Sequence, residues 1–188
     1  VVVGNRPVLV RGYGLVVNLK GTGSRDLPPD LRAFMLNEMS KRGIGRDPLG
    51  QTPSPQALLD SPDTAVVIVE AVIPAGATKG TRFDVRCVAD PRTGTTNLDG
   101  GTLYTCDLRP PTQGELLPRT GQNTSFAIGA AHGPIFINPF VEPGSANINT
   151  TTGRVLDGGV VTRDIPIKLR LGRPSHNLAR VIQRAINT

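Results

Sequence analysis

Apolar residues recur with helical spacing in the first quarter of the chain. Phe34 and Met35 follow Leu31 by three and four residues, and Met39 follows Met35 by four, which places all of them on one face of a helix. Prolines stand at the start of this stretch and a glycine follows its end, as is common at helix termini. The pattern therefore predicts a helix over residues 29–42, with its Phe and Met stripe turned towards the core.

A second helix is predicted at the end of the chain. Ser175 is a suitable N-cap, because its side chain can accept a hydrogen bond from the first turn. The apolar stripe that follows contains Leu178, Val181, Ile182, Ala185 and Ile186. Before it, apolar residues at 165, 167, 169 and 171 alternate with other residues, which predicts a half-exposed strand. Pro166 favours an edge position or a strand start for this segment.

Several other segments are predicted as strands or loops. Residues 7–10 and 15–19 are predicted as two short strands on either side of a Gly-containing stretch. Residues 64–73 are a nearly continuous apolar, β-branched run, typical of a strand buried on both faces. Residues 47–62 contain four prolines and are predicted as an extended loop. Strand-like pieces lie within 125–137, and a polar loop is expected at 147–152.

Two segments with alternating polarity are predicted to pair. If residues 81–89 and 102–108 are antiparallel with Cys87 opposite Cys106, then Val85 faces Leu108 and Ala89 faces Tyr104, so each of these pairs lies on the apolar face. The connection over 90–101 is long, polar and Gly-rich. The side chains on this shared face are Phe83, Val85, Cys87 and Ala89 on one strand, and Tyr104, Cys106 and Leu108 on the other.

This register makes a disulfide between Cys87 and Cys106 a candidate. Two cysteines opposite each other in neighbouring strands are within bridging reach, and a bridge persists in an oxidising compartment. The alternative is a pair of buried free thiols, because cysteine packs as a small apolar side chain.

Composition adds the overall class. The chain has 188 residues, of which 22 are Gly and 17 Pro, and aromatic residues make up only 4%. Together with the patterns, this predicts an α+β fold: a mixed or antiparallel β-sheet, two amphipathic helices and long Gly/Pro-rich loops. The chain is expected to form one region over 1–188, with a division into subdomains near residue 120 (about 1–120 and 121–188) left open. The longest apolar run is far below the ~20 residues of a membrane helix, so no membrane span is expected.

Positive charge gathers near the end of the sequence. The formal net charge is +6, and from residue 154 onward basic residues clearly outnumber acidic ones. Such a segment can contact nucleic acid, anionic lipid or an acidic polymer, and a solvated surface is the plain alternative. Nucleic acid is disfavoured because no aromatic residues interleave with the charges to stack on bases. The candidate basic surface comprises Lys168, Arg170, Arg173, Arg180 and Arg184.

No combination of residues predicts catalysis. The chain has two histidines, His132 and His176, and two cysteines, without the spacing of a zinc or nucleophile motif. The glycines between Gly12 and Gly23 fit neither the phosphate-loop pattern nor the dinucleotide-binding pattern, because the required positions do not match. We therefore predict neither an enzyme nor a metal or cofactor site.

One glycine-rich stretch resembles a known family. Residues 12–23 read G-Y-G-L-V-V-N-L-K-G-T-G, and flagellar P-ring proteins carry a motif that reads roughly G-Y-G-L-V-V-G-L-N-G-T-G. Asn18 and Lys20 replace the family's Gly and Asn. Further blocks resemble the family in the same order, among them residues 100–103, 169–171 and 179–187. The motif residues carried over are Gly12, Tyr13, Gly14, Gly21, Thr22 and Gly23.

The resemblance implies a structural role. It identifies the chain as similar to the N-terminal half of a longer, non-catalytic P-ring subunit that is exported to the periplasm and has no cofactor. Such subunits self-assemble as a ring around the flagellar rod in the basal body, near peptidoglycan, and partner the L ring. The alternative is a non-catalytic cell-envelope binding module whose basic segment contacts an acidic polymer such as peptidoglycan.

Overall fold

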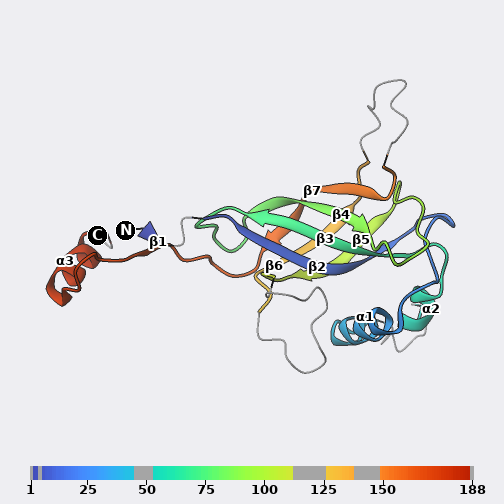
Figure 1. Ribbon diagram of the computed structural model, residues 1–188, viewed down its shortest axis with the longest axis horizontal. Coiled ribbons are helices and arrows are strands. Elements are labelled where there is room, and N and C mark those ends of the chain that lie inside the picture. Colours follow the sequence, from blue (N-terminus) through green and yellow to red (C-terminus); the bar gives the residue numbers. More distant parts are fainter. Residues whose placement is uncertain (1, 4–5, 45–52, 112–125, 138–148, 187–188) are drawn as a thin grey trace, which may run out of the picture.

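Six antiparallel strands form a closed barrel (Figure 1). The structure, a computed structural model, describes residues 2–3, 6–44, 53–111, 126–137 and 149–186. Each barrel strand pairs on both sides, so the barrel has no open edge. In the order in which they neighbour one another, the strands are β2 (Val8–Val17), β3 (Ala65–Ile73), β4 (Arg82–Ala89), β7 (Thr152–Val161), β6 (Gly129–Pro134) and β5 (Thr102–Leu108), which returns to β2.

The barrel interior is filled by small and medium apolar side chains. Along most of the barrel strands alternate residues point inward, as the two-residue period of a strand requires, and β5 and β7 each contain one interruption of this alternation. The predicted faces of residues 81–89 are confirmed, because β4 buries Phe83, Val85, Cys87 and Ala89 and exposes the charged residues Arg82, Asp84 and Arg86. Residues that are at most 1% exposed in this core include Val10, Val67, Val69, Val85, Leu108 and Val161.

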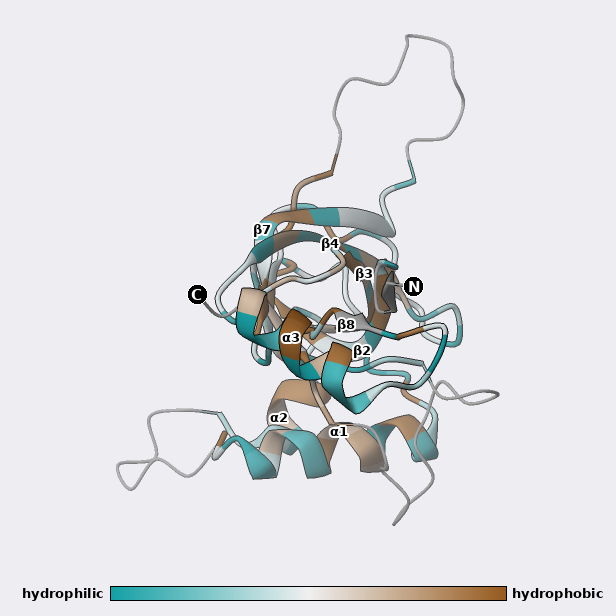
Figure 2. Cartoon of the chain, turned by 90° about the vertical axis from the view of Figure 1, so that its left-hand side faces the viewer, coloured by the Kyte–Doolittle hydropathy of each residue, from teal (hydrophilic) through white to brown (hydrophobic). Residues whose placement is uncertain are grey.

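Two helices cover the outside of β2 and β3 (Figures 1 and 2). Helix α1 (Pro29–Lys41) agrees with the predicted helix to within one residue, and it buries Leu31, Met35 and Met39. These side chains pack with Tyr13, Leu15 and Val66, which point outward from the barrel. As predicted, most of β3 is therefore buried on both faces, and only Val72 near its end is exposed.

The second of these helices, α2 (Pro55–Leu59), corrects the prediction of a continuous extended loop. Ser54 caps it by accepting a hydrogen bond from the Ala57 N–H at 3.2 Å, and Pro55 occupies the first turn, where no N–H donor is needed. Most of the predicted loop before it, residues 47–52, lies outside the described residues.

A small extension projects from one end of the barrel (Figure 1). Strand β1 (Val2–Val3) pairs antiparallel with β8 (Lys168–Leu169), and α3 (His176–Ile186) follows. The predicted N-cap is confirmed, because the Ser175 hydroxyl accepts a hydrogen bond from the Leu178 N–H at 3.4 Å. The predicted strand over 165–171 is shorter than expected, since only β8 forms a ladder. The described residues thus contain three helices instead of the two predicted.

The predicted pairing of the two cysteine-bearing strands is wrong. Strand β4 lies between β3 and β7, whereas β5 lies between β2 and β6. Cys87 is therefore opposite Val69 and Gly153, and Cys106 is opposite Ala131. The predicted place of Tyr104 on the apolar face is also wrong: the register of β5 shifts between residues 103 and 106, and Tyr104 faces outward.

Two further strands differ from the predictions. The two short strands expected at 7–10 and 15–19 are one continuous strand, β2, which runs through the glycine-containing stretch between them. Strand β7 was not predicted at all, because its three glycines are more typical of turns. Its glycines are required by packing: a Cβ at Gly159 would overlap the ring of Phe83. Strands from both sides of residue 120 pair within the same barrel.

Candidate functional site

The first half of the glycine motif closes the barrel. Gly12 lies in β2 where this strand approaches β5 so closely that a Cβ would overlap the carbonyl oxygen of Asp107. Next to it, the N–H of Arg11 donates to the carbonyl of Arg109 at 2.8 Å, and the N–H of Arg109 donates back at 2.9 Å. Gly14 also faces inward, where a Cβ would lie 2.6 Å from Leu103 Cδ1. Both glycines thus allow the last pair of strands to meet.

Tyr13 points the opposite way and anchors α1. Its ring is buried and meets Phe34 edge-to-face, with centroids 5.8 Å apart and an interplanar angle of 66°. Burial raises the pKa of the Tyr13 hydroxyl above its ordinary value, with the nearby Asp90 charge adding to the effect. The phenol therefore stays neutral, and its role is to hold the helix layer on the barrel.

The second half of the motif fixes the chain that leaves β2. The Gly23 N–H donates to the carbonyl of Pro62 at 2.8 Å, and a Cβ at Gly23 would overlap the carbonyl oxygen of Thr64. The Thr22 hydroxyl lies 2.7 Å from the carbonyl oxygen of Leu19 and 2.8 Å from that of Asn97. This half of the motif thereby joins three segments that are far apart in sequence.

The two departures from the family motif fall on unusual backbone. Asn18 has φ 67° and Lys20 has φ 51°, and Gly21 follows with φ 87°. Glycine and asparagine tolerate this left-handed region better than other residues, which explains why the family motif has Gly and Asn at the positions of Asn18 and Lys20. Lys20 is the residue of the motif that carries backbone strain.

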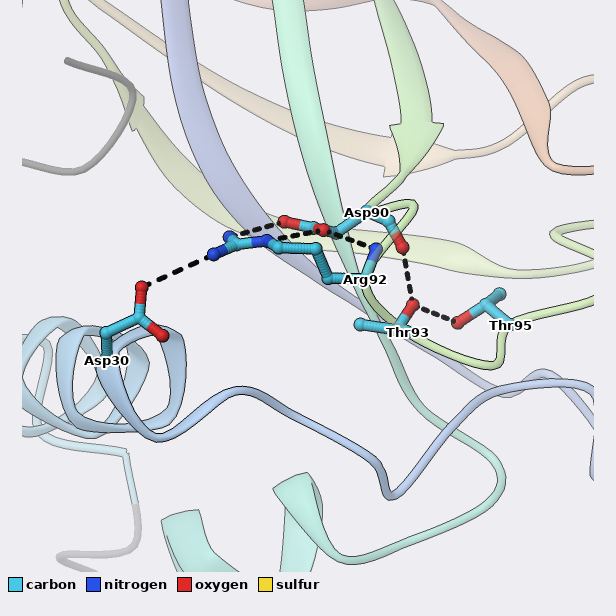
Figure 3. A network of polar contacts seen from close by, with 5 residues as sticks. All are labelled: Asp30, Asp90, Arg92, Thr93 and Thr95. Carbon is cyan, nitrogen blue, oxygen red and sulfur yellow. Dashed lines mark hydrogen bonds and ion pairs between the residues drawn. The ribbon is translucent and has the colours of Figure 1, made fainter.

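A buried carboxylate organises the connection between β4 and β5 (Figure 3). Asp90 is 1% exposed, and its carboxylate accepts hydrogen bonds from Arg92 Nε at 3.0 Å and Nη2 at 2.9 Å. Burial by itself would raise the pKa of Asp90, but the hydrogen bonds from Arg92 outweigh it and hold the pKa below its ordinary value. Arg92 also reaches Asp30 at the start of α1, with Nη1 3.3 Å from Oδ2.

This network was missed at the level of sequence. The sequence feature that indicates it is an aspartate directly after a buried strand with an arginine two residues later. Because the same pattern also occurs in solvated loops, it does not by itself predict a buried network. Thr93 completes it by donating to the carbonyl of Asp90 at 2.8 Å, and Thr95 lies 3.2 Å from the Thr93 hydroxyl (Figure 3). Every polar atom named here has a partner within the protein, so the network positions a loop and has no group directed at a ligand.

The two cysteines lie inside the barrel as free thiols. Burial raises the pKa of each to about 12, and for Cys106 the proximity of Cys87 adds to this. Because only the thiolate is a good nucleophile, neither cysteine is reactive near neutral pH. The predicted register placed Cys87 opposite Cys106, whereas in the structure their strands are not neighbours.

The candidate basic surface belongs to the extension and not to the barrel. Arg173 and Arg180 are exposed. Arg170 and Arg184 are exposed as well and make further interactions. Lys168 contributes its backbone to β8. On its other side α3 presents apolar residues to solvent: Leu178 is 49% exposed, Val181 63% and Ile186 65%.

The histidines do not come together with other ligating groups. His132 lies exposed in β6 and His176 is the exposed first residue of α3. Within the described ranges, no three His, Cys, Asp or Glu residues are placed to share a metal ion. In the same part of the chain, no helix combines the length and the apolar character needed to cross a membrane.

Comparison with known proteins assigns the family. The family described as flagellar P-ring protein matches residues 1–188. The chain is 30% identical to a flagellar P-ring protein of Aquifex aeolicus, with 98% of this chain and 48% of the relative covered. It is 32% identical to one of Campylobacter lari (100% and 50%) and 28% identical to one of Paramagnetospirillum magneticum (98% and 47%). The chain spans about half the length of these relatives, and it belongs to the flagellar P-ring protein family.

Proposed function

We propose that this chain is part of a structural, non-catalytic subunit of the flagellar P ring. In this proposal the subunit lies in the periplasm, assembles with copies of itself into a ring around the rod, and partners the L ring. It uses no cofactor and contacts no nucleic acid.

One observation carries the proposal beyond the family match. The residues that resemble the family motif are used in closing the barrel and fixing its loops, because Gly12, Gly14 and Gly23 stand where a side chain would meet another strand or loop. A motif of this kind preserves a shape instead of a reactive group. A preserved rigid shape is what a self-assembling subunit requires, since small distortions accumulate around a closed ring.

A test uses a chimera of the relatives' length. The chain is joined to the unmatched half of the Campylobacter lari relative, and the chimera is expressed in a strain of that organism lacking its own P-ring protein. We expect basal bodies with a ring at the level of the P ring when isolated particles are viewed by electron microscopy. A stably folded, exported chimera that never enters basal bodies would contradict the proposed role.

The basic extension supports a second candidate, a module that binds an acidic envelope polymer such as peptidoglycan. Arg173 and Arg180 present positive charge to solvent without a neighbouring acidic residue in α3. Binding of the chain to purified cell-wall sacculi should then weaken with salt over the range where the Debye length falls from ~10 to ~3 Å. It should also weaken in the Arg173→Gln/Arg180→Gln variant, whereas an Arg82→Gln/Arg86→Gln variant on the barrel serves as a charge-matched control.

A further inference from the structure

The extension exposes an apolar side of α3 that would be buried in a complete domain. In α3, Leu178, Val181, Ile182 and Ile186 share one side of the helix, and Arg180 lies on the other. Figure 2 shows this division as brown and teal sides of the helix. No residue of α3 is buried, although its apolar stripe is as continuous as that of α1, which buries three residues.

Neither element of the extension is stable by its own local interactions. Helix α3 has 11 residues, and isolated helices shorter than about 12–15 residues are marginal in water. The β1–β8 ladder joins only two residues from each strand, and a single two-stranded ladder is likewise marginal. A further layer is needed to give these elements a core.

The attachment to the barrel does not supply that layer. The N–H of Ile165 donates to the carbonyl of Ala77 at 2.9 Å, and Asp164 Oδ1 accepts from the Lys79 N–H at 2.7 Å. Ile167 lies over Gly76, where a Cβ would be 2.6 Å from Ile167 Cδ1. These contacts hold the segment before β8, and α3 lies beyond them, away from the barrel (Figure 1).

We propose that the β1–β8 ladder and α3 are one part of a second domain, completed by the half of the relatives' length that this chain does not span. The partner surface has an apolar face that packs on Leu178, Val181 and Ile186, and a strand that extends an edge of the ladder. Such strand addition satisfies the backbone groups at an open sheet edge. The proposal depends on family membership and does not depend on ring assembly.

A covalently joined segment is favoured over a second copy of the chain. The relatives are about twice as long as the matched region, so in those proteins the same polypeptide contains further residues from which such a layer can be built. A joined segment acts at an effective concentration near millimolar, far above that of a separate subunit. The ladder already joins residues 2–3 to residues 168–169, which shows that this unit is assembled from segments distant in sequence.

Hydrogen exchange measured by mass spectrometry tests the proposal. The amides of residues 176–186 are compared in the chain alone, at two concentrations, and in the chain joined to the unmatched half of the Aquifex aeolicus relative. We expect fast exchange in the chain alone and exchange slowed by at least ~100-fold in the joined, monomeric polypeptide. The joined half reports its own folding through its own slowly exchanging amides.

A pair of substitutions makes the test specific to the apolar face. Val181→Asp should abolish the added protection in the joined polypeptide, and Gln183→Asp, at a polar position of the same helix, should preserve it. Protection that rises with concentration in the chain alone would identify a second copy as the occupant and overturn the proposal. Unchanged fast exchange beside a folded joined half, or protection that appears only on cell-wall sacculi, would overturn it as well.

Discussion

Replacing Gly12 by alanine should destabilise the barrel at its closing seam. A methyl group at this position overlaps the carbonyl oxygen of Asp107, which is backbone and cannot turn away. Relief requires β2 and β5 to separate, and the two hydrogen bonds between Arg11 and Arg109, at 2.8 and 2.9 Å, lie directly beside the overlap. The substitution therefore acts on strand pairing as well as on packing.

The magnitude follows from opposing contributions. Inserting a methyl group into a filled site costs about 1–3 kcal/mol, and weakening two hydrogen bonds adds about 1 kcal/mol each. The loss of glycine's freedom in the unfolded chain offsets about 0.4–1 kcal/mol. The net decrease in the free energy of unfolding is roughly 3 kcal/mol, a large part of the 5–15 kcal/mol typical of a domain.

Urea denaturation followed by circular dichroism measures this change. For a chain of this size, 3 kcal/mol also corresponds to a decrease in Tm of roughly 6–12 °C. Gly172→Ala is the matched control, because a Cβ there meets nothing within 4 Å, and it should leave the midpoint nearly unchanged. A loss below ~0.5 kcal/mol for Gly12→Ala would refute the argument that close approach of the two strands requires glycine.

Three other properties should follow from the structure. Because the folded-state pKa of Asp90 is depressed, its contribution to stability is complete above its unfolded pKa and is lost as the pH falls through the lower folded value; urea midpoints of wild type and Asp90→Asn should therefore converge in acid. Cys87 and Cys106, each with a pKa raised to about 12, should resist iodoacetamide at pH 8 in the folded chain. Both should react when the chain is unfolded in urea without a reducing agent, and failure to react there would indicate a disulfide. Lys20→Asn, which suits φ 51°, should raise the free energy of unfolding by about 0.5 kcal/mol, and an unchanged urea midpoint would mean that the backbone there is not strained.

The pattern of apolar and polar residues predicted the elements that pack a single apolar side against a single core. Helix α1 and strand β4 each present one apolar side to one core, so their periods of 3.6 and 2 residues identify them. The cap at Ser175 was also predictable, because capping depends on neighbours within one turn.

The neighbours of each strand were not predictable in the same way. In a closed barrel every strand turns its apolar face inward, so alternation identifies the face and leaves the partner open. The predicted register between Cys87 and Cys106 satisfied the apolar pattern, yet both strands have other neighbours on both sides. Strand β7 was missed for a related reason, since glycine at 159 is required by Phe83, a residue more than seventy positions earlier.

The site residues divide into two groups, and substitutions in the two groups should have different effects on stability and on the proposed ring assembly. Substitutions in the glycine motif act through the barrel, so they should lower stability and reduce the amount of folded subunit. Substitutions on α3, such as Val181→Asp, change a side chain that is 63% exposed, so they should leave the barrel's stability unchanged. An assembly defect in a variant of the second group, with normal stability, therefore reports on a surface and not on the fold. This separation makes the extension the place to look for contacts beyond the chain, because the residues that resemble the family motif are already used within it.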